Sequence, residues 1–240
     1  MAVFIFVIFV SARSTELPII LHPLIPLHSV TPLKPLRFAS LLVNHPDKYA
    51  VSHFCNGLTH GFSLGYFGPQ LTRSTNNAQT AFQHPDIVAK YIKKEIESKH
   101  TAGPFAAPPL PHFVISSLGV RPKKTGGVRL IMDLSRPFDN SVNDYISKEA
   151  FTLRFSNIDE AVALVAASGV GSYMAKMDVK SAFRLIPVRK EDWNLLGYKH
   201  DNQYYFDTVL PFGLRSSPAI FNRLSEFMKW LLITTGPTRS

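Results

Sequence analysis

The sequence predicts an α+β fold, and three local patterns support this class. The runs FVISSLGV and VRLIMDL flank a Gly-rich turn at residues 122–127 and predict a β-hairpin. A second hairpin is predicted from residues 195–199 and 204–209. Amphipathic helical stretches stand between and after the hairpins. Because these elements do not alternate as strand–helix–strand units, the sequence favours α+β over a doubly wound α/β architecture.

Length and composition exclude several classes of protein. The chain has 240 residues, room for one large domain or two smaller ones, and its 45% apolar content excludes disorder throughout. The single cysteine, Cys55, excludes an intramolecular disulfide framework and a cysteine-cluster zinc site. The 26 Lys and Arg residues outnumber the 17 Asp and Glu residues, which favours a polyanionic partner, nucleic acid first and an anionic membrane second.

Residues 1–34 are predicted to be an apolar, proline-rich lead-in. The first ten residues are wholly apolar, but a helix needs about 20 to cross a bilayer, so we expect no stable membrane span. The run has the length of a signal-peptide core and lacks its positively charged start. We therefore expect an intracellular protein, in the cytoplasm or nucleus, with a signal peptide as the alternative. Repeated prolines over residues 17–36 predict extended chain.

Residues 35–111 are predicted to form a helical extension that ends in a connector. Apolar residues recur with near-helical spacing over residues 39–60. The stretch IVAKYIKKEIESKH predicts a second amphipathic helix with a basic outer face. The polar residues 76–83 predict a loop, and the proline-rich residues 103–111 predict a connector, not a strand.

Residues 112–240 contain the two hairpins and the remaining predicted elements. Residues 158–167 predict a helix that is capped near Ser156 or Asn157 and ended by Gly169. A short strand is predicted over residues 173–178. The clearest helix of the chain opens at Ser216-Ser217-Pro218, with Ser as its N-cap and Pro in its first turn.

Two segments near the C-terminal end could carry chemistry. Asp178 ends the predicted strand 173–178, where one carboxylate could bind a hard divalent cation, although a lone Asp there is more often a turn or cap residue. Gly213 stands between the second hairpin and the capped helix. It would allow a ligand to approach the backbone beside the free N–H groups of a helix N-terminus, or it marks an ordinary loop.

The first hairpin gathers the positive charges of Arg121, Lys123, Lys124 and Arg129. Such charges usually lie on a solvated surface. At a hairpin tip they could also clamp a triphosphate, because Lys and Arg are strong phosphate ligands.

Together, and in this order, the three segments resemble the fingers and palm of a reverse transcriptase. SSLGVRPKKTGGVRLIMDLSRPFDNSVND (residues 116–144) is similar to the fingers hairpin and its following strand. MDVKSAFRLIPV (177–188) is similar to the first palm motif, and LPFGLRSSPAIFNRL (210–224) to the second. The motif sequences are more similar to those of gypsy-type and tyrosine-recombinase retrotransposons than to those of retroviruses, which usually carry Gln at the position of Phe212. The resemblance spans roughly residues 35–235.

The resemblance implies RNA-directed DNA synthesis on an RNA or DNA template–primer. The family joins a primer 3′-OH to a deoxynucleoside triphosphate with two Mg²⁺ ions about 3.5–4 Å apart, and Mn²⁺ could replace them. By this resemblance Asp178 would ligate both ions and Val179 would lend its backbone carbonyl. Phe183 would be the steric gate, its ring leaving no room for a 2′-OH, while plain core packing is its alternative role.

The resemblance also implies a set of residues that hold the nucleotide. Lys123 or Lys124, together with Arg129, would hold the β- and γ-phosphates. Phe212 and Gly213 would lie beside the incoming nucleotide.

The sequence departs from the family at its third palm motif, an aromatic-X-Asp-Asp turn that supplies the remaining carboxylates. None of the aspartates in this chain is adjacent to another. We therefore expect a fingers-and-partial-palm fragment that relies on the missing palm and thumb segments of a longer polyprotein and does not polymerise alone. The alternative is a non-catalytic nucleic-acid-binding remnant, whose binding would be salt-sensitive.

Overall fold

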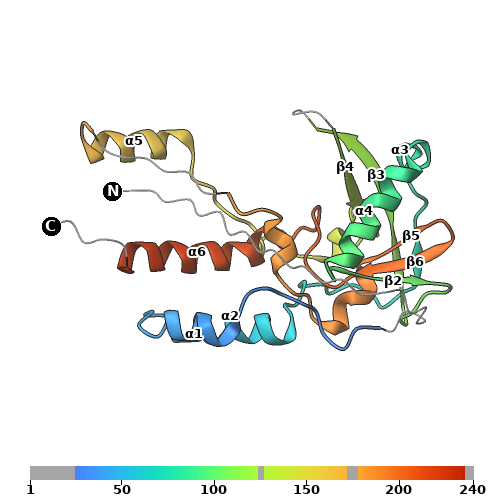
Figure 1. The fold of residues 1–240 in the computed structure, drawn as a ribbon, viewed down its shortest axis with the longest axis horizontal. Helices are drawn as coiled ribbons and strands as arrows, with labels where there is room; N and C mark the ends of the chain where they lie inside the picture. The colour runs from blue at the N-terminus through green and yellow to red at the C-terminus, as the bar shows by residue number, and fades with distance from the viewer. Residues whose placement is uncertain (1–24, 124–126, 172–177, 236–240) are drawn as a thin grey trace.

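A six-stranded sheet and a group of helices make up the two sides of the molecule (Figure 1). The computed structural model describes residues 25–123, 127–171 and 178–235. The strands are β1 (Arg73–Ser74), β2 (Thr101–Phe105), β3 (Val114–Pro122), β4 (Val128–Asp133), β5 (Gly197–His200) and β6 (Gln203–Asp207). The helices are α1 (Pro35–Leu41), α2 (Lys48–His60), α3 (Gln79–Gln83), α4 (Pro85–Glu97), α5 (Ile158–Ser168) and α6 (Ser217–Thr235), with short 3-10 helices η1 (Asn143–Tyr145), η2 (Ala182–Leu185) and η3 (Lys190–Leu195).

The α+β prediction and both predicted hairpins are confirmed. Strands β3 and β4 pair antiparallel, from Ser117 opposite Asp133 to Pro122 opposite Val128. Strands β5 and β6 pair antiparallel as well. The residues that connect them, Asp201 and Asn202, have positive φ angles of 48° and 58°, as a type I′ turn requires.

The sheet joins strands from both halves of the sequence. Its order is β1-β3-β5-β6-β2, and β4 pairs with β3 outside this path. The aromatic core beside it is built from Trp193 and Phe113, whose rings lie 5.6 Å and 6.4 Å from that of Phe206. Helix α4 packs against β2 and β4.

The helical side is formed by α1, α2 and α6, which lie next to one another away from the sheet (Figure 1). The ring of Phe54 on α2 lies 5.1 Å from that of Phe227 on α6, and His45, between α1 and α2, packs on Trp230 at 4.8 Å. Helix α5 begins as predicted, because the side chain of Asn157 accepts a hydrogen bond from the Glu160 N–H at 2.9 Å.

Two predicted elements differ from the structure. The helix predicted over residues 39–60 is two helices, α1 and α2. Pro46 lacks the N–H that a continuous helix needs, and Asp47 starts α2 by accepting a hydrogen bond from the Ala50 N–H at 2.8 Å. The connector prediction for residues 103–111 is wrong at its start, because β2 runs through Pro104. Proline is tolerated there since β2 is the edge strand of the sheet.

The loop prediction for residues 76–83 is also wrong in part, because α3 occupies residues 79–83. The reason is tertiary contact. Asn77 Oδ1 accepts the N–H of Leu118 at 2.9 Å and Thr80 Oγ1 accepts that of Val120 at 3.1 Å, so these polar side chains cover free backbone groups of β3.

Two sequence predictions lie outside the described residues. They are the apolar run 1–10 and nearly all of the strand 173–178, of which only Asp178 is described, without strand pairing. Within residues 25–123, 127–171 and 178–235, no helix has the length and apolar content to cross a membrane.

Candidate nucleotide site

The segment with the predicted metal ligand leads directly into a tight turn. Asp178 and Val179 are exposed and precede η2. Ser181, the residue before η2, has a left-handed φ of 54°, which is uncommon for a residue with a side chain. The turn is closed by the Arg184 N–H, which donates to the Ser181 carbonyl at 2.8 Å. Phe183 projects from this turn.

The structure brings Phe183 and Phe212 together. Their ring centroids are 5.0 Å apart, and Phe221 of α6 packs edge-on against Phe183 at 5.8 Å. Phe212 is 51% exposed, so the pair reaches the surface. The first and second of the palm-like motifs therefore meet at one aromatic contact that a ligand can reach.

The bend that carries Phe212 is held by a buried asparagine that the sequence reasoning missed. Asn143 donates from Nδ2 to the Gly213 carbonyl at 2.8 Å and accepts the Arg215 N–H at Oδ1, also at 2.8 Å. Its backbone N–H donates to the Leu134 carbonyl just after β4 at 3.0 Å. A lone Asn among other polar residues gives no signal for this role.

Gly213 itself lies close to the hairpin of β3 and β4. Its φ is 92°, and a Cβ at this position would lie 3.1 Å from the Met132 carbonyl oxygen. Glycine therefore allows the bend to approach the backbone of β4. The predicted close approach is present, with the first hairpin as the neighbour.

A buried ion cluster lies on the other side of η2 and was also missed. Arg184 is 3% exposed and forms ion pairs with Glu95 of α4 at 2.8 Å and with Asp207 of β6 at 2.5 Å. Burial penalises the charge of Arg184, but the two carboxylates outweigh it and raise the pKa of the guanidinium. A signal was available in the sequence, because Arg184 is a lone charge within the apolar run AFRLIPV.

The cluster predicts a dependence of stability on pH. Burial alone would raise the pKa of Glu95, but its hydrogen bonds with His100 and Arg184 and the charge of Arg184 lower it to about 2, from an ordinary 4.5. A carboxylate with a lowered folded-state pKa stabilises the fold above its unfolded pKa and loses that contribution as the pH falls toward the folded value. The unaltered chain is expected to lose free energy of unfolding between about pH 5 and 2. In Glu95→Gln we expect this loss to be smaller by about 2–3 kcal/mol. Urea unfolding at several pH values measures this, and parallel curves for both proteins would contradict it.

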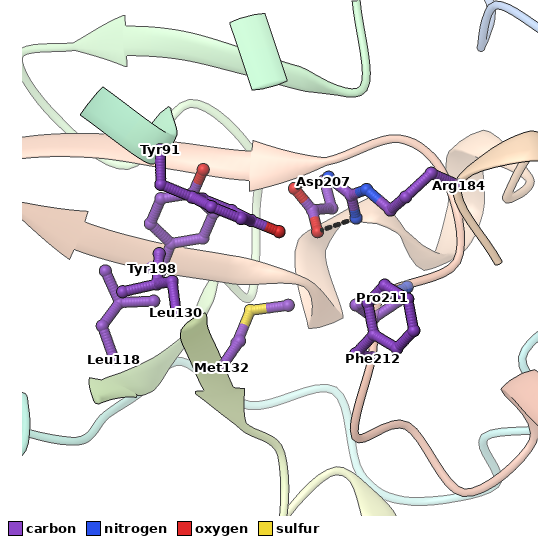
Figure 2. Close-up of a pocket in the computed structure, with 9 residues that line it drawn as sticks. All are labelled: Tyr91, Leu118, Leu130, Met132, Arg184, Tyr198, Asp207, Pro211 and Phe212. Carbon is purple, nitrogen blue, oxygen red and sulfur yellow. Dashed lines mark hydrogen bonds and ion pairs between the residues drawn. The ribbon is translucent and has the colours of Figure 1, made fainter. Parts of the chain in front are cut away.

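A small pocket lies between the hairpin β3–β4, α4 and the Phe212 bend (Figure 2). Its apolar wall includes Leu130 and Met132 of β4, and Arg184 and Asp207 line its polar end. Tyr91 points toward Asp207 in Figure 2, and burial raises the pKa of its hydroxyl to about 12. The pocket thus connects the ion cluster to the back of the Phe212 bend.

The cations of the first hairpin are exposed and stand apart from this aromatic contact. Lys123 and Arg129 are both on the surface, and Lys124 lies outside the described residues. Because side chains alternate along a strand, Arg129 lies on the opposite face of β4 from Leu130 and Met132, which line the pocket. Among the described residues, no hydrogen bond, ion pair or ring contact joins these cations to Phe183 or Phe212.

The oxygen atoms available at Asp178 and Val179 are of the type that binds magnesium. A carboxylate and the backbone carbonyl of Val179 are hard oxygen ligands, the type that Mg²⁺ prefers. In the part of the chain that the structure describes, no group of three or more His, Cys, Asp or Glu side chains is arranged so that it could hold a metal ion. These residues therefore fit one ion that keeps most of its shell as water or phosphate oxygen.

The second half of the chain is similar to known sequences. Residues 121–233 match the model of the family described as "Reverse transcriptase (RNA-dependent DNA polymerase)". The Tf2-3 and Tf2-7 transposon polyproteins of Schizosaccharomyces pombe are each 30% identical over 100 residues, which is 42% of this chain. The match spans only 7% of the length of these polyproteins.

Solved structures of foamy virus proteins align with much of this chain. The protease-reverse transcriptase dRH in complex with double-stranded DNA aligns over 91% of this chain and 39% of its own, at 14% identity and a TM-score of 0.49. The complex with an RNA/DNA hybrid aligns over 89% and 29%, at 15% identity and a TM-score of 0.47.

Residues 121–233 are therefore similar to the reverse transcriptase family, and retrotransposon polyproteins are among the similar sequences.

Proposed function

We propose that this chain is the nucleotide-binding part of a retrotransposon RNA-directed DNA polymerase, its fingers and the first part of its palm. The observation that carries the proposal is the contact between Phe183 and Phe212, at 5.0 Å. It joins the two palm-like motifs at the surface, and the exposed Asp178 precedes Phe183 by five positions in the chain. The sequences of the motifs support a relationship to the tyrosine-recombinase and gypsy-type groups of retrotransposons.

Each residue has a role in this proposal. Asp178 and the Val179 carbonyl hold Mg²⁺, which when bound neutralises charge on the triphosphate. Phe183 lies under the sugar and excludes a 2′-OH, while Phe212 and Gly213 flank the nucleotide. Lys123 or Lys124 and Arg129 belong to the hairpin that closes on the β- and γ-phosphates.

The 240-residue chain alone is proposed not to extend a primer. Two-metal phosphoryl transfer needs several carboxylates to hold both ions, and the resemblance assigns only Asp178 in this sequence. The remaining ligands would come from further palm segments of a polyprotein, as would the thumb.

Primer extension with Mg²⁺ tests both parts of the proposal. We expect no extension by this chain and extension by an intact homologous polyprotein. In that polyprotein, replacing the aspartate that corresponds to Asp178 by Ala should abolish the reaction. Full activity after this change would refute the metal assignment, and extension by the chain alone would refute its inactivity.

A second function, nucleic-acid binding without chemistry, is favoured by the net charge of +9 and the exposed cations Lys123 and Arg129. We expect a template–primer duplex to bind with an affinity that falls steeply with salt. Removing both cations should reduce the slope of log K against log salt by about 0.9 per lost phosphate contact. Fluorescence anisotropy measures the slope. Lys190→Ala, which removes an exposed charge on η3, is the control and should leave the slope unchanged.

A further inference from the structure

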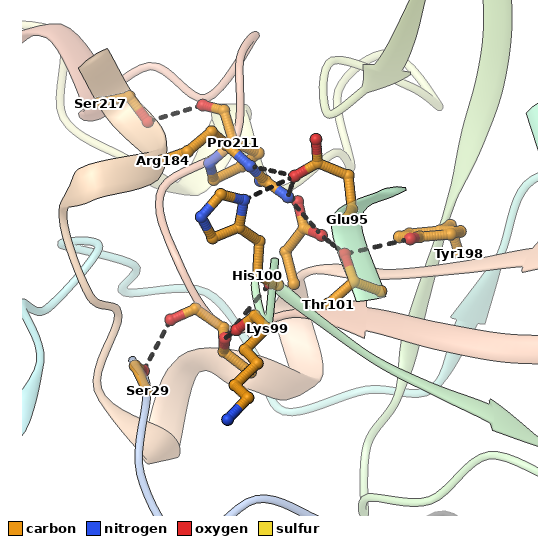
Figure 3. A network of polar contacts seen from close by, with 11 residues as sticks. Ser29, Glu95, Lys99, His100, Thr101, Arg184, Tyr198, Pro211 and Ser217 are labelled. Atoms are coloured by element: carbon orange, nitrogen blue, oxygen red, sulfur yellow. Dashed lines mark hydrogen bonds and ion pairs between the residues drawn. The ribbon is translucent and has the colours of Figure 1, made fainter. Parts of the chain in front are cut away.

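The ion cluster behind η2 links the candidate nucleotide site to a helix outside the family match (Figure 3). Arg184 lies directly after Phe183, within residues 121–233. Glu95, its partner, lies on α4, before that range. The side chain of Arg184 is thus anchored partly by a segment that lies outside the matched residues.

All three nitrogen atoms of the Arg184 guanidinium donate hydrogen bonds to the two carboxylates. Nε and Nη2 donate to Glu95 Oε2 at 2.9 Å and 2.8 Å. Nη1 donates to Asp207 Oδ2 at 2.5 Å and Nη2 to Asp207 Oδ1 at 3.1 Å. Glu95 and Asp207 are 6% and 5% exposed, so all three charges are buried. Charge-assisted hydrogen bonds of this kind fix a side chain in both position and orientation.

A second layer of hydrogen bonds orients the two carboxylates. His100 Nδ1 lies 2.9 Å from Glu95 Oε2. Thr101 Oγ1 donates to Asp207 Oδ1 at 2.5 Å and in turn accepts from the Tyr198 hydroxyl at 3.3 Å. His100 and Thr101 follow α4 in the chain, so α4 and the start of β2 act together on the cluster.

The turn that Arg184 anchors needs external support. Ser181 holds a left-handed φ of 54°, and such a conformation costs of the order of 1 kcal/mol for a residue with a side chain. It persists only where surrounding contacts determine the backbone. Here the Arg184 N–H closes the turn on the Ser181 carbonyl, while its side chain ties the same residue to α4 and β6.

We propose that Glu95, acting through Arg184, is a positioning residue that sets the place of the Phe183 ring against Phe212 and thereby the discrimination between deoxy- and ribonucleoside triphosphates. The inference rests on the proposed function for its ligand. It assigns to α4 a part in substrate selection, because loss of the Glu95 charge would leave Arg184 held from the β6 side alone. Phe183 would then follow a looser turn.

Hydrogen exchange of the chain tests the positioning step without any need for activity. In Glu95→Gln, which keeps the shape of the side chain, we expect residues 181–186 to exchange about tenfold faster. Glu97→Gln is the matched control, since Glu97 lies on the same helix in an exposed pair with Lys93 at 4.0 Å. Exchange at residues 181–186 equal to that of the control would overturn the inference.

A milder variant decides the case if Glu95→Gln does not fold. Thr101→Val removes the hydrogen bond to Asp207 and the acceptor of the Tyr198 hydroxyl, without leaving a charge unpaired. We expect faster exchange at residues 181–186, by a smaller factor, while peptides of α2 and α6 stay unchanged. An unchanged rate at 181–186, or an equal rise everywhere, would overturn the inference.

Calorimetric binding of dUTP and UTP with Mg²⁺, two nucleotides that differ only at C2′, tests the selectivity step. We expect the ratio of the two dissociation constants to shrink in Glu95→Gln and to stay unchanged in Glu97→Gln. An unchanged ratio in Glu95→Gln would overturn the selectivity claim. If the unaltered chain binds neither nucleotide, the proposed function fails, whereas the exchange of residues 181–186 still decides whether Glu95 positions the turn.

Discussion

Arg184→Met is expected to lower the free energy of unfolding by about 3–5 kcal/mol, the usual effect of removing one partner from a buried ion pair. The methionine keeps most of the apolar stem, so the loss would come from charge more than from volume. Glu95 and Asp207 would be left facing each other in the interior with no cation between them. Two uncompensated buried carboxylates are more costly than the packing defect.

Urea unfolding followed by circular dichroism measures this loss. Arg154→Met is the matched control, because Arg154 also pairs with a carboxylate, Glu160 at 2.6 Å, but its side chain is 87% exposed. Exposed pairs contribute about 0–1 kcal/mol, so this variant should unfold close to the unaltered chain. Similar losses in the two variants would show that the cluster around Arg184 does not carry the stability assigned to it.

Replacing Phe183 by Ala is expected to have the largest effect on substrate selection. In an intact homologous polyprotein, the corresponding change should raise ribonucleotide use relative to deoxynucleotide use by an order of magnitude or more, because in the proposed gate role the ring fills the space of a 2′-OH. The ratio of kcat/KM for UTP and dUTP, which differ only at C2′, measures the effect in primer extension.

The aromatic cluster supplies a control for this experiment. Phe221 packs against Phe183 at 5.8 Å from helix α6, and its Ala variant removes comparable packing without opening the proposed sugar position. We expect it to reduce stability and to leave the ratio unchanged. An unchanged ratio in the Phe183 variant, or an equal change in both, would mean that Phe183 is a core residue and not a gate.

The hairpins and the start of α5 could be predicted because their signals are local. The type I′ turn at Asp201-Asn202 and the cap at Asn157 each depend on residues within a few positions along the chain. The edge strand β2 and the short helix α3 could not be predicted in this way. Their stability comes from pairing with β6 and from hydrogen bonds to β3, which local composition does not record.

The candidate site divides along the same line. The resemblance of the motifs leads to Phe183 and Phe212, which the structure brings together. The side chains that hold these two residues in place could not be predicted from the sequence. Asn143 contacts Gly213 from 70 positions away, and Glu95 contacts Arg184 from 89. The roles of the hairpin cations stay predictions, because their contacts depend on a bound nucleotide.

A nucleotide titration of this chain, observed by NMR on labelled phenylalanines, tests the central claim most directly. We expect dTTP with Mg²⁺ to shift the signals of Phe183 and Phe212 together. We expect Asp178→Asn to weaken these shifts. Phe105, which packs against Phe206 at 5.8 Å in the sheet, should stay unchanged. Saturating dTTP that leaves Phe183 and Phe212 unmoved, or a response indifferent to Asp178, would contradict the account.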